Sequence, residues 1–138
     1  MNRVRFTIMK SMTIWGEEGN QNTHINEIIS GIKSAFCSPL AWYGTIPDEP
    51  ETKPGDQMIL KDPSGKNRLL IEITEIRNMT FGEADESVAK AVLDCDLQDF
   101  RDAHRYYWGE ELAEDGILMN DDLPIVVEYF KIISFPKL

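Results

Sequence analysis

The segment 123–135 constrains the fold more than any other part of the chain. It is rich in Val, Ile, Tyr and Phe, and its apolar residues occupy both sets of alternate positions. Because successive side chains of a strand point to opposite faces, this pattern predicts a strand that is buried on both sides. Such a strand lies at the centre of a sheet or closes a barrel.

Other segments predict the elements that pack around this strand. Segments 58–60 and 69–76 are rich in strand-forming residues, and the turn residues of 62–66 join them into a hairpin. Apolar spacing predicts a helix over 83–93 and a second helix capped by Asp96. Strands, then helices, then a last strand predict one α+β domain over residues 1–138. The alternation of Val4, Phe6 and Ile8 is compatible with a strand or an irregular lead into the domain.

Lys33 lies where a helix is predicted to end and a strand to begin. The spacing of the isoleucines before it indicates the helix, and Gly31 suits the left-handed residue that closes one. A partly desolvated lysine there can bind an anionic or carbonyl oxygen, or act as a base. An exposed strand-edge lysine that discourages aggregation is the alternative. The isoleucines are Ile25, Ile28, Ile29 and Ile32, and the polar neighbours of Lys33 in sequence are Ser34, Cys37 and Ser38.

Glu128 interrupts the apolar pattern of the last strand. Its neighbours on the same face, Val126 and Phe130, are apolar, so its carboxylate faces the interior or a pocket wall. A buried carboxylate needs a partner, and Arg101 and Lys33 are the candidates. The pair is either a structural ion pair or part of a binding site.

Aromatic residues gather near the predicted site. Trp42 follows the lysine segment in a predicted loop and is a candidate to line a cavity and stack on a base. Tyr107 and His104 share helical spacing with Phe100, which favours a core position for Tyr107 and a structural role for His104.

Charge and cysteine usage limit the function classes. The chain has 14 basic and 24 acidic residues, a net charge of −10, which opposes phosphate-driven binding of long nucleic acid but leaves a local pocket for a nucleotide or RNA end. Cys37, Cys95, His24 and His104 show no zinc spacing and no disulfide framework, so no metal and no cofactor are expected. With no signal peptide or membrane span recognised, a cytoplasmic location is predicted.

Several segments together resemble the ASCH domain family. They are GIKSAFCSPLAWY, then Lys53-Pro54-Gly55-Asp56, LLIEITEI, FRDAHRYY and DLPIVVEYF, and the similarity runs over residues 15–133. The resemblance implies a PUA-like β-barrel with flanking helices and a link to RNA or modified nucleosides.

The family also implies two activities. Small members act as amidohydrolases on N4-acetylcytidine, using a lysine, a threonine shortly after it and a glutamate, and another member is a ribonuclease. Lys33 matches the lysine, but Phe36 occupies the threonine position. The glutamate region here contains Asp94 and no glutamate.

The resulting hypothesis is a module that binds RNA, a nucleotide or a modified nucleoside in a pocket beside Lys33. The predicted ligand-binding residues are Ser34, Ser38, Trp42, Arg101 and Glu128. One alternative is a hydrolase in which Lys33 is a catalytic base or electrostatic stabiliser. Another is a protein-interaction domain without a ligand.

Overall fold

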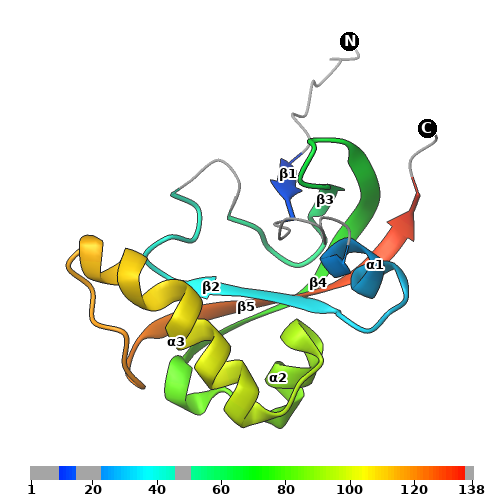
Figure 1. Ribbon diagram of the computed structural model, residues 1–138. Helices are drawn as coiled ribbons and strands as arrows, with labels where there is room; N and C mark the ends of the chain where they lie inside the picture. The colour runs from blue at the N-terminus through cyan, green and yellow to red at the C-terminus, as the bar shows by residue number, and fades with distance from the viewer. Residues whose placement is uncertain (1–9, 15–22, 46–50, 136–138) are drawn as a thin grey trace.

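A curved mixed sheet forms the frame of the protein. The computed structural model describes residues 10–14, 23–45 and 51–135, so Val4, Phe6 and Ile8 lie outside the described residues. Along the sheet the strands are β1 (Lys10–Thr13), β3 (Gln57–Lys61), β4 (Asn67–Thr80), β5 (Pro124–Ser134) and β2 (Ala35–Pro39) (Figure 1). The β1–β3 pair is parallel, and the other three pairs are antiparallel.

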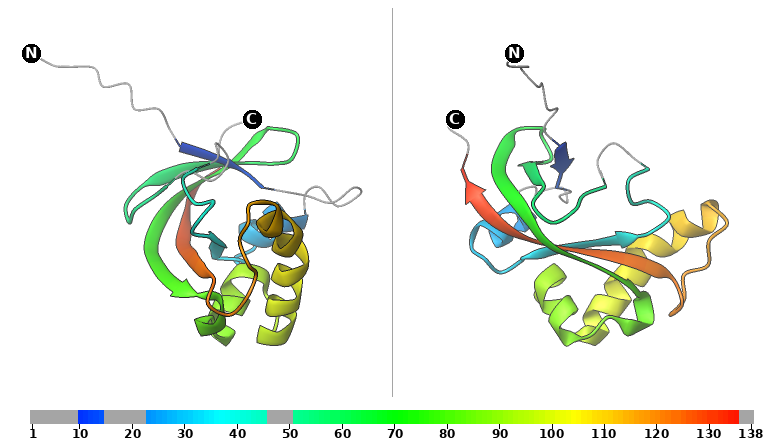
Figure 2. Two further views of the ribbon diagram at one scale, coloured as in Figure 1. Left: turned by 90° about the vertical axis from the view of Figure 1, so that its left-hand side faces the viewer. Right: turned by 180° about the vertical axis from the view of Figure 1, so that it is seen from behind.

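The last strand lies between two partners, as its sequence predicts. Strand β5 pairs with the long β4 on one side and with β2 on the other. Ile125, Val126 and Val127 are each about fully buried, which confirms that both faces of the strand are covered. The strong curvature of β4 and β5 turns the sheet into a half-barrel (Figure 2). The predicted α+β class with barrel-like curvature is therefore confirmed.

The helices cover the sheet in two groups. Helix α1 (Thr23–Ile29) packs Ile25 and Ile28 against the core inside the half-barrel. Helices α2 (Glu86–Leu93) and α3 (Leu97–Glu114) cover the opposite face around a second core that contains Phe81 and Phe100. Residues of β2 and β5 therefore contribute alternately to the two cores, because successive side chains point to opposite faces.

Helix boundaries differ from the sequence prediction at two places. Helix α1 ends at Ile29, Gly31 follows with a φ of +82°, and Ile32 is 45% exposed rather than part of the buried stripe. The helix predicted from residue 83 is interrupted, because a short 3₁₀ turn (Phe81–Glu83) comes first and Asp85 caps α2 by accepting a hydrogen bond from the Val88 amide. Asp96 caps α3 as predicted.

Candidate functional site

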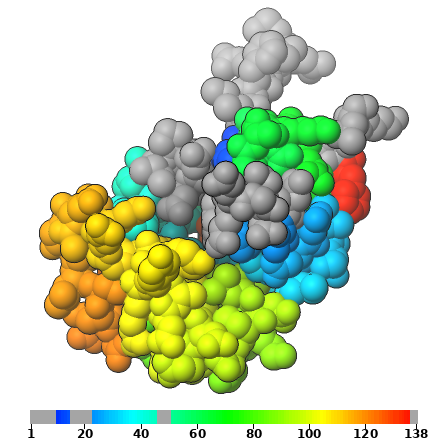
Figure 3. Space-filling view, viewed as in Figure 1, coloured from blue at the N-terminus to red at the C-terminus, as the bar shows by residue number. Residues whose placement is uncertain are grey.

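A cavity of about 610 Å³ lies beside β2, between α1 and α3. The space-filling view shows the surface hollowed next to α3, in yellow (Figure 3). Its volume lies in the range typical of small-molecule sites. The polar groups of the lining come from α1, the turn that follows it, β2, β5 and α3, and they include His24, Lys33, Cys37, Ser38, His104 and Glu128.

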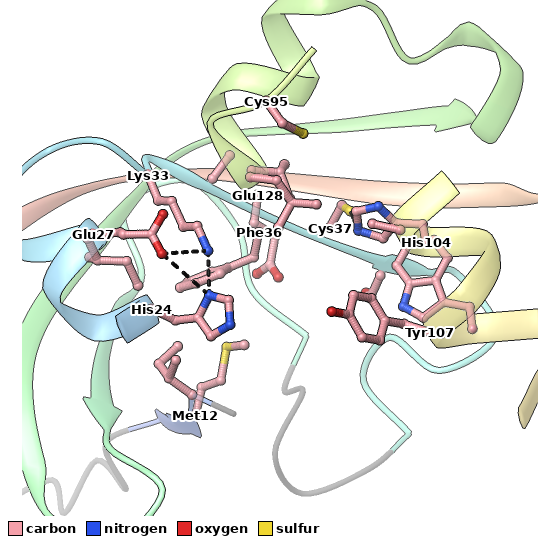
Figure 4. Close-up of a pocket in the computed structure, with 18 of the residues that line it drawn as sticks. Met12, His24, Glu27, Lys33, Phe36, Cys37, Cys95, His104, Tyr107 and Glu128 are labelled. Carbon is pink, nitrogen blue, oxygen red and sulfur yellow. Dashed lines mark hydrogen bonds and ion pairs between the residues drawn. The ribbon is translucent and has the colours of Figure 1, made fainter. Parts of the chain in front are cut away.

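Lys33 is buried at one end of the cavity. Its side chain is 6% exposed, and its Nζ lies 2.5 Å from His24 Nδ1 and 3.7 Å from Glu27 Oε1 (Figure 4). The Lys33 amide also donates a hydrogen bond to the Glu27 carbonyl oxygen. This bond positions the Lys33 backbone beside the end of α1. Burial lowers the pKa of Lys33, and the nearby Glu27 carboxylate partly opposes that shift. The exposed-edge interpretation of this lysine is therefore wrong.

Glu128 contributes a second buried polar group. It lies opposite Phe36 in the β2–β5 pair, and the residue is 7% exposed. The hydroxyl of Thr52 donates a hydrogen bond to its carboxylate. Burial raises the pKa of Glu128, although the Thr52 bond opposes the shift. The partner is thus a hydroxyl and not the Arg101 or Lys33 that the sequence indicated.

Thr52 is itself held by Tyr43. The Thr52 amide donates to the Tyr43 hydroxyl oxygen at 2.7 Å, and that hydroxyl lies 3.0 Å from the Thr52 carbonyl oxygen, to which it can donate. Burial raises the pKa of the Tyr43 hydroxyl. These bonds connect the turn after β2 with the segment before β3. Neither residue is predicted from the sequence, because no local pattern relates Thr52 to a glutamate 76 positions away.

Cys37 and His104 meet along the same cavity. Cys37 Sγ lies 3.4 Å from His104 Nε2, and His104 Nδ1 lies 2.8 Å from the Phe100 carbonyl oxygen. Because that carbonyl can only accept, Nδ1 carries the ring hydrogen and Nε2 presents its lone pair to Cys37. Burial lowers the pKa of His104, which favours this neutral ring. His104 is satisfied in the interior, as predicted, but it also lines the cavity.

The structure brings together some of the predicted ligand-binding residues. Ser38, Trp42 and Glu128 line the cavity with Lys33. Ser34 does not, because its side chain is exposed while its backbone bonds to Ala91 and Phe130.

Arg101 and Tyr107 also differ from the sequence expectation. Arg101 lies outside the described lining, and its Nη2 donates to the Gly82 carbonyl oxygen at 3.2 Å. Tyr107 is 51% exposed and lines the cavity, so its predicted core position is wrong. The helical spacing places Tyr107 on the side of α3 that borders the cavity rather than among the buried residues.

The described residues offer no membrane helix or metal cluster. None of the described helices is long and apolar enough to cross a membrane. Over the same part of the chain, no group of three or more His, Cys, Asp or Glu residues is arranged to hold a metal ion. Cys37 and Cys95 form no disulfide.

Comparisons with known proteins agree with the architecture. The chain is similar to protein EF3133 from Enterococcus faecalis V583, with 24% identity, a TM-score of 0.78, and coverage of 96% of this chain and 86% of that one. It is also similar to an ASCH domain from Lactobacillus crispatus JV V101, with 25% identity, a TM-score of 0.75, and coverage of 92% and 81%. No curated protein matches. The profile of the ASCH domain matches residues 11–134, and the chain therefore belongs to the ASCH domain family.

Proposed function

We propose that this ASCH domain binds a nucleoside-type ligand in the cavity beside Lys33: a modified nucleoside, a nucleotide or the end of an RNA. The observation that carries the proposal is the combination of aromatic walls with buried polar groups. Trp42, Tyr107 and Trp108 line the cavity, and Lys33 and Glu128 are 6% and 7% exposed. Aromatic faces stack on bases, and a few buried polar groups fix the orientation of a ligand.

The charges of the lining favour a ligand with little negative charge. Among the described lining residues, Lys33 is the one lysine or arginine, whereas Glu27, Asp99, Glu111 and Glu128 carry carboxyl groups. A ligand with several phosphates would meet more repulsion than attraction here. A nucleoside is therefore the preferred member of the proposed class, and long RNA is disfavoured further by the net charge of −10.

Calorimetric titration tests the proposal. Cytidine, N4-acetylcytidine, cytidine monophosphate and a short RNA are titrated into the wild-type chain and into Lys33→Met and Trp42→Leu. The matched control is Lys90→Met, because Lys90 is exposed on α2 and lies outside the described lining. Loss of a charge-assisted hydrogen bond should weaken binding by about tenfold or more in Lys33→Met.

Two outcomes would remove the binding proposal. In the first, none of these ligands binds to folded wild-type protein. In the second, Lys33→Met and Lys90→Met change the ligand affinity by the same factor, and Trp42→Leu binds the ligand as tightly as the wild type does. Thermal unfolding of each variant shows that the comparison is made between folded proteins.

A hydrolase is the second candidate, and the environment of Lys33 favours it. A lysine with a lowered pKa, in contact with His24 Nδ1, is suited to act as a base. Against it, Phe36 at the family's threonine position stacks on Phe130, with ring centroids 4.6 Å apart, and offers no hydroxyl. Release of cytidine from N4-acetylcytidine, separated by chromatography and abolished in Lys33→Met, would favour the hydrolase; no release from folded protein would leave the binding proposal.

A protein-interaction domain without a ligand has less support. That alternative predicts an absent or collapsed cavity beside Lys33, whereas a cavity of about 610 Å³ lies there.

A further inference from the structure

Cys37 and His104 are arranged as a thiol and a base. Their reactive atoms, Sγ and Nε2, lie 3.4 Å apart, and both residues line the cavity. Figure 4 shows them side by side at the end of the cavity away from Lys33. The binding proposal uses neither atom, so this pair needs its own explanation.

The histidine ring is fixed in the orientation that a base requires. The bond from Nδ1 to the Phe100 carbonyl oxygen sets the tautomer and leaves the lone pair on Nε2. The rings of Phe100 and Trp108 pack against it, with centroids 4.3 and 4.5 Å away. A nucleophile hydrogen-bonded to a base that a third group orients is the arrangement used in covalent catalysis.

Cys95 provides an internal comparison. It also lines the cavity and has a similar intermediate exposure. Burial and the carboxylates of Asp99 and Asp96 raise the pKa of its thiol. The two cysteines therefore line one cavity in different surroundings, with a histidine beside Cys37 and carboxylates near Cys95.

We propose that Cys37 is a nucleophile activated by His104, which accepts an acyl group from a compound bound in the cavity. The sulfur attacks the acyl carbon while its hydrogen passes to His104 Nε2. The tetrahedral intermediate then collapses, the bond from the acyl carbon to the leaving oxygen or nitrogen breaks, and the leaving group takes the proton from Nε2. The product is a thioester on Cys37, which water hydrolyses to a carboxylic acid and the restored thiol.

The first experiment measures thiol reactivity without any cavity ligand. Folded wild-type protein is treated with limiting iodoacetamide, and peptide mass spectrometry compares alkylation at Cys37 and Cys95. Activation by His104 should make Cys37 react about tenfold faster or more, and the difference should vanish in urea. Equal rates in the folded protein, or a faster reaction at Cys95, would overturn the proposal.

The second experiment tests the base and the acyl step. His104→Asn keeps a donor for the Phe100 carbonyl oxygen but has no atom at the Nε2 position, whereas His104→Gln places an amide there. Both should slow alkylation of Cys37 about tenfold and leave Cys95 unchanged. p-Nitrophenyl acetate should acetylate Cys37 in wild-type protein, as a mass increase on that peptide, and far less in either variant.

These measurements separate this inference from the proposed function. Fast alkylation of Cys37 with neither an acetyl adduct nor faster release of p-nitrophenolate than in the His104 variants would overturn acyl transfer. Calorimetry with nucleosides is read independently, because neither iodoacetamide nor p-nitrophenyl acetate is a nucleoside. If the histidine variants do not fold, the alkylation rate of Cys37 in the folded wild-type protein is compared with its own rate in urea, and a folded rate no higher than the rate in urea would overturn the thiol step.

Discussion

Thr52 donates its hydroxyl hydrogen to the carboxylate of Glu128, across 76 positions of sequence. The bond places a charged residue of β5 against the segment that precedes β3. Both side chains are buried, so each one gives the other a hydrogen-bond partner that water does not provide. Glu128 is thereby held at the wall of the cavity rather than in a salt bridge.

Replacing Thr52 by valine should destabilise the fold. Thr52→Val keeps the shape of the side chain but leaves the buried Glu128 carboxylate without this donor, at a cost of about 1–3 kcal/mol in the free energy of unfolding. Thr52→Ser retains the hydroxyl and serves as the matched control. Urea unfolding at neutral pH gives both values, and a loss in Thr52→Ser with none in Thr52→Val would show that the methyl group matters and the hydrogen bond does not.

Glu128 should make stability depend on pH in a defined direction. Its pKa is raised in the folded state, chiefly by burial, so as pH rises above the ordinary carboxyl value the unfolded chain loses its proton first. The contribution of Glu128 to stability is therefore fully present below its pKa in the unfolded chain. It is lost as pH rises through its pKa in the folded state. Urea unfolding over a pH series should show the free energy of unfolding of Glu128→Gln rising relative to that of the wild type between the unfolded and folded pKa of Glu128. A constant difference between the two proteins would contradict the shift.

The ammonium of Lys33 should titrate below the ordinary lysine range. Burial lowers its pKa, while the Glu27 carboxylate opposes the shift. The variant Glu27→Gln should therefore lower the Lys33 pKa further. The measurement is the ¹³Cε chemical shift of Lys33 against pH, assigned from the signal missing in Lys33→Met. Lys90 is the control lysine, and an unchanged Lys33 midpoint in Glu27→Gln would count against the electrostatic role of Glu27.

The core beneath α3 should depend strongly on Phe100. This residue is fully buried, and its ring stacks on Phe81 at a centroid distance of 6.0 Å. Phe100→Ala should lower the free energy of unfolding by about 3–5 kcal/mol, because it leaves a cavity in a packed interior. The matched control is Tyr106→Ala on the same helix, since Tyr106 is 82% exposed and should cost little. Similar losses in both variants would contradict the assignment of the core.

Local sequence pattern predicted the main elements because each depends on short-range periodicity. Apolar residues on both faces of segment 123–135 correctly predicted the buried strand β5. Asp96 correctly predicted the start of α3. The turn residues of 62–66 place a hairpin between β3 and β4, where the Asp62 carboxylate accepts bonds from the amides of Ser64 and Lys66. The predicted helix from residue 83 was wrong at its start, because Asp85 offers a better cap.

The sequence by itself determined that a strand follows Lys33, that Glu128 is buried and that the chain resembles the ASCH family. Strand β2 begins at Ala35, so the prediction that Lys33 lies on the first residues of the strand was wrong. Only the tertiary structure decided which groups meet. Glu128 bonds to Thr52 rather than to Arg101, Cys37 lies against His104, and Lys33 reaches His24. Periodicity reports the face on which a side chain lies, whereas long-range partners are set by how the sheet curves and how α1 and α3 pack against it.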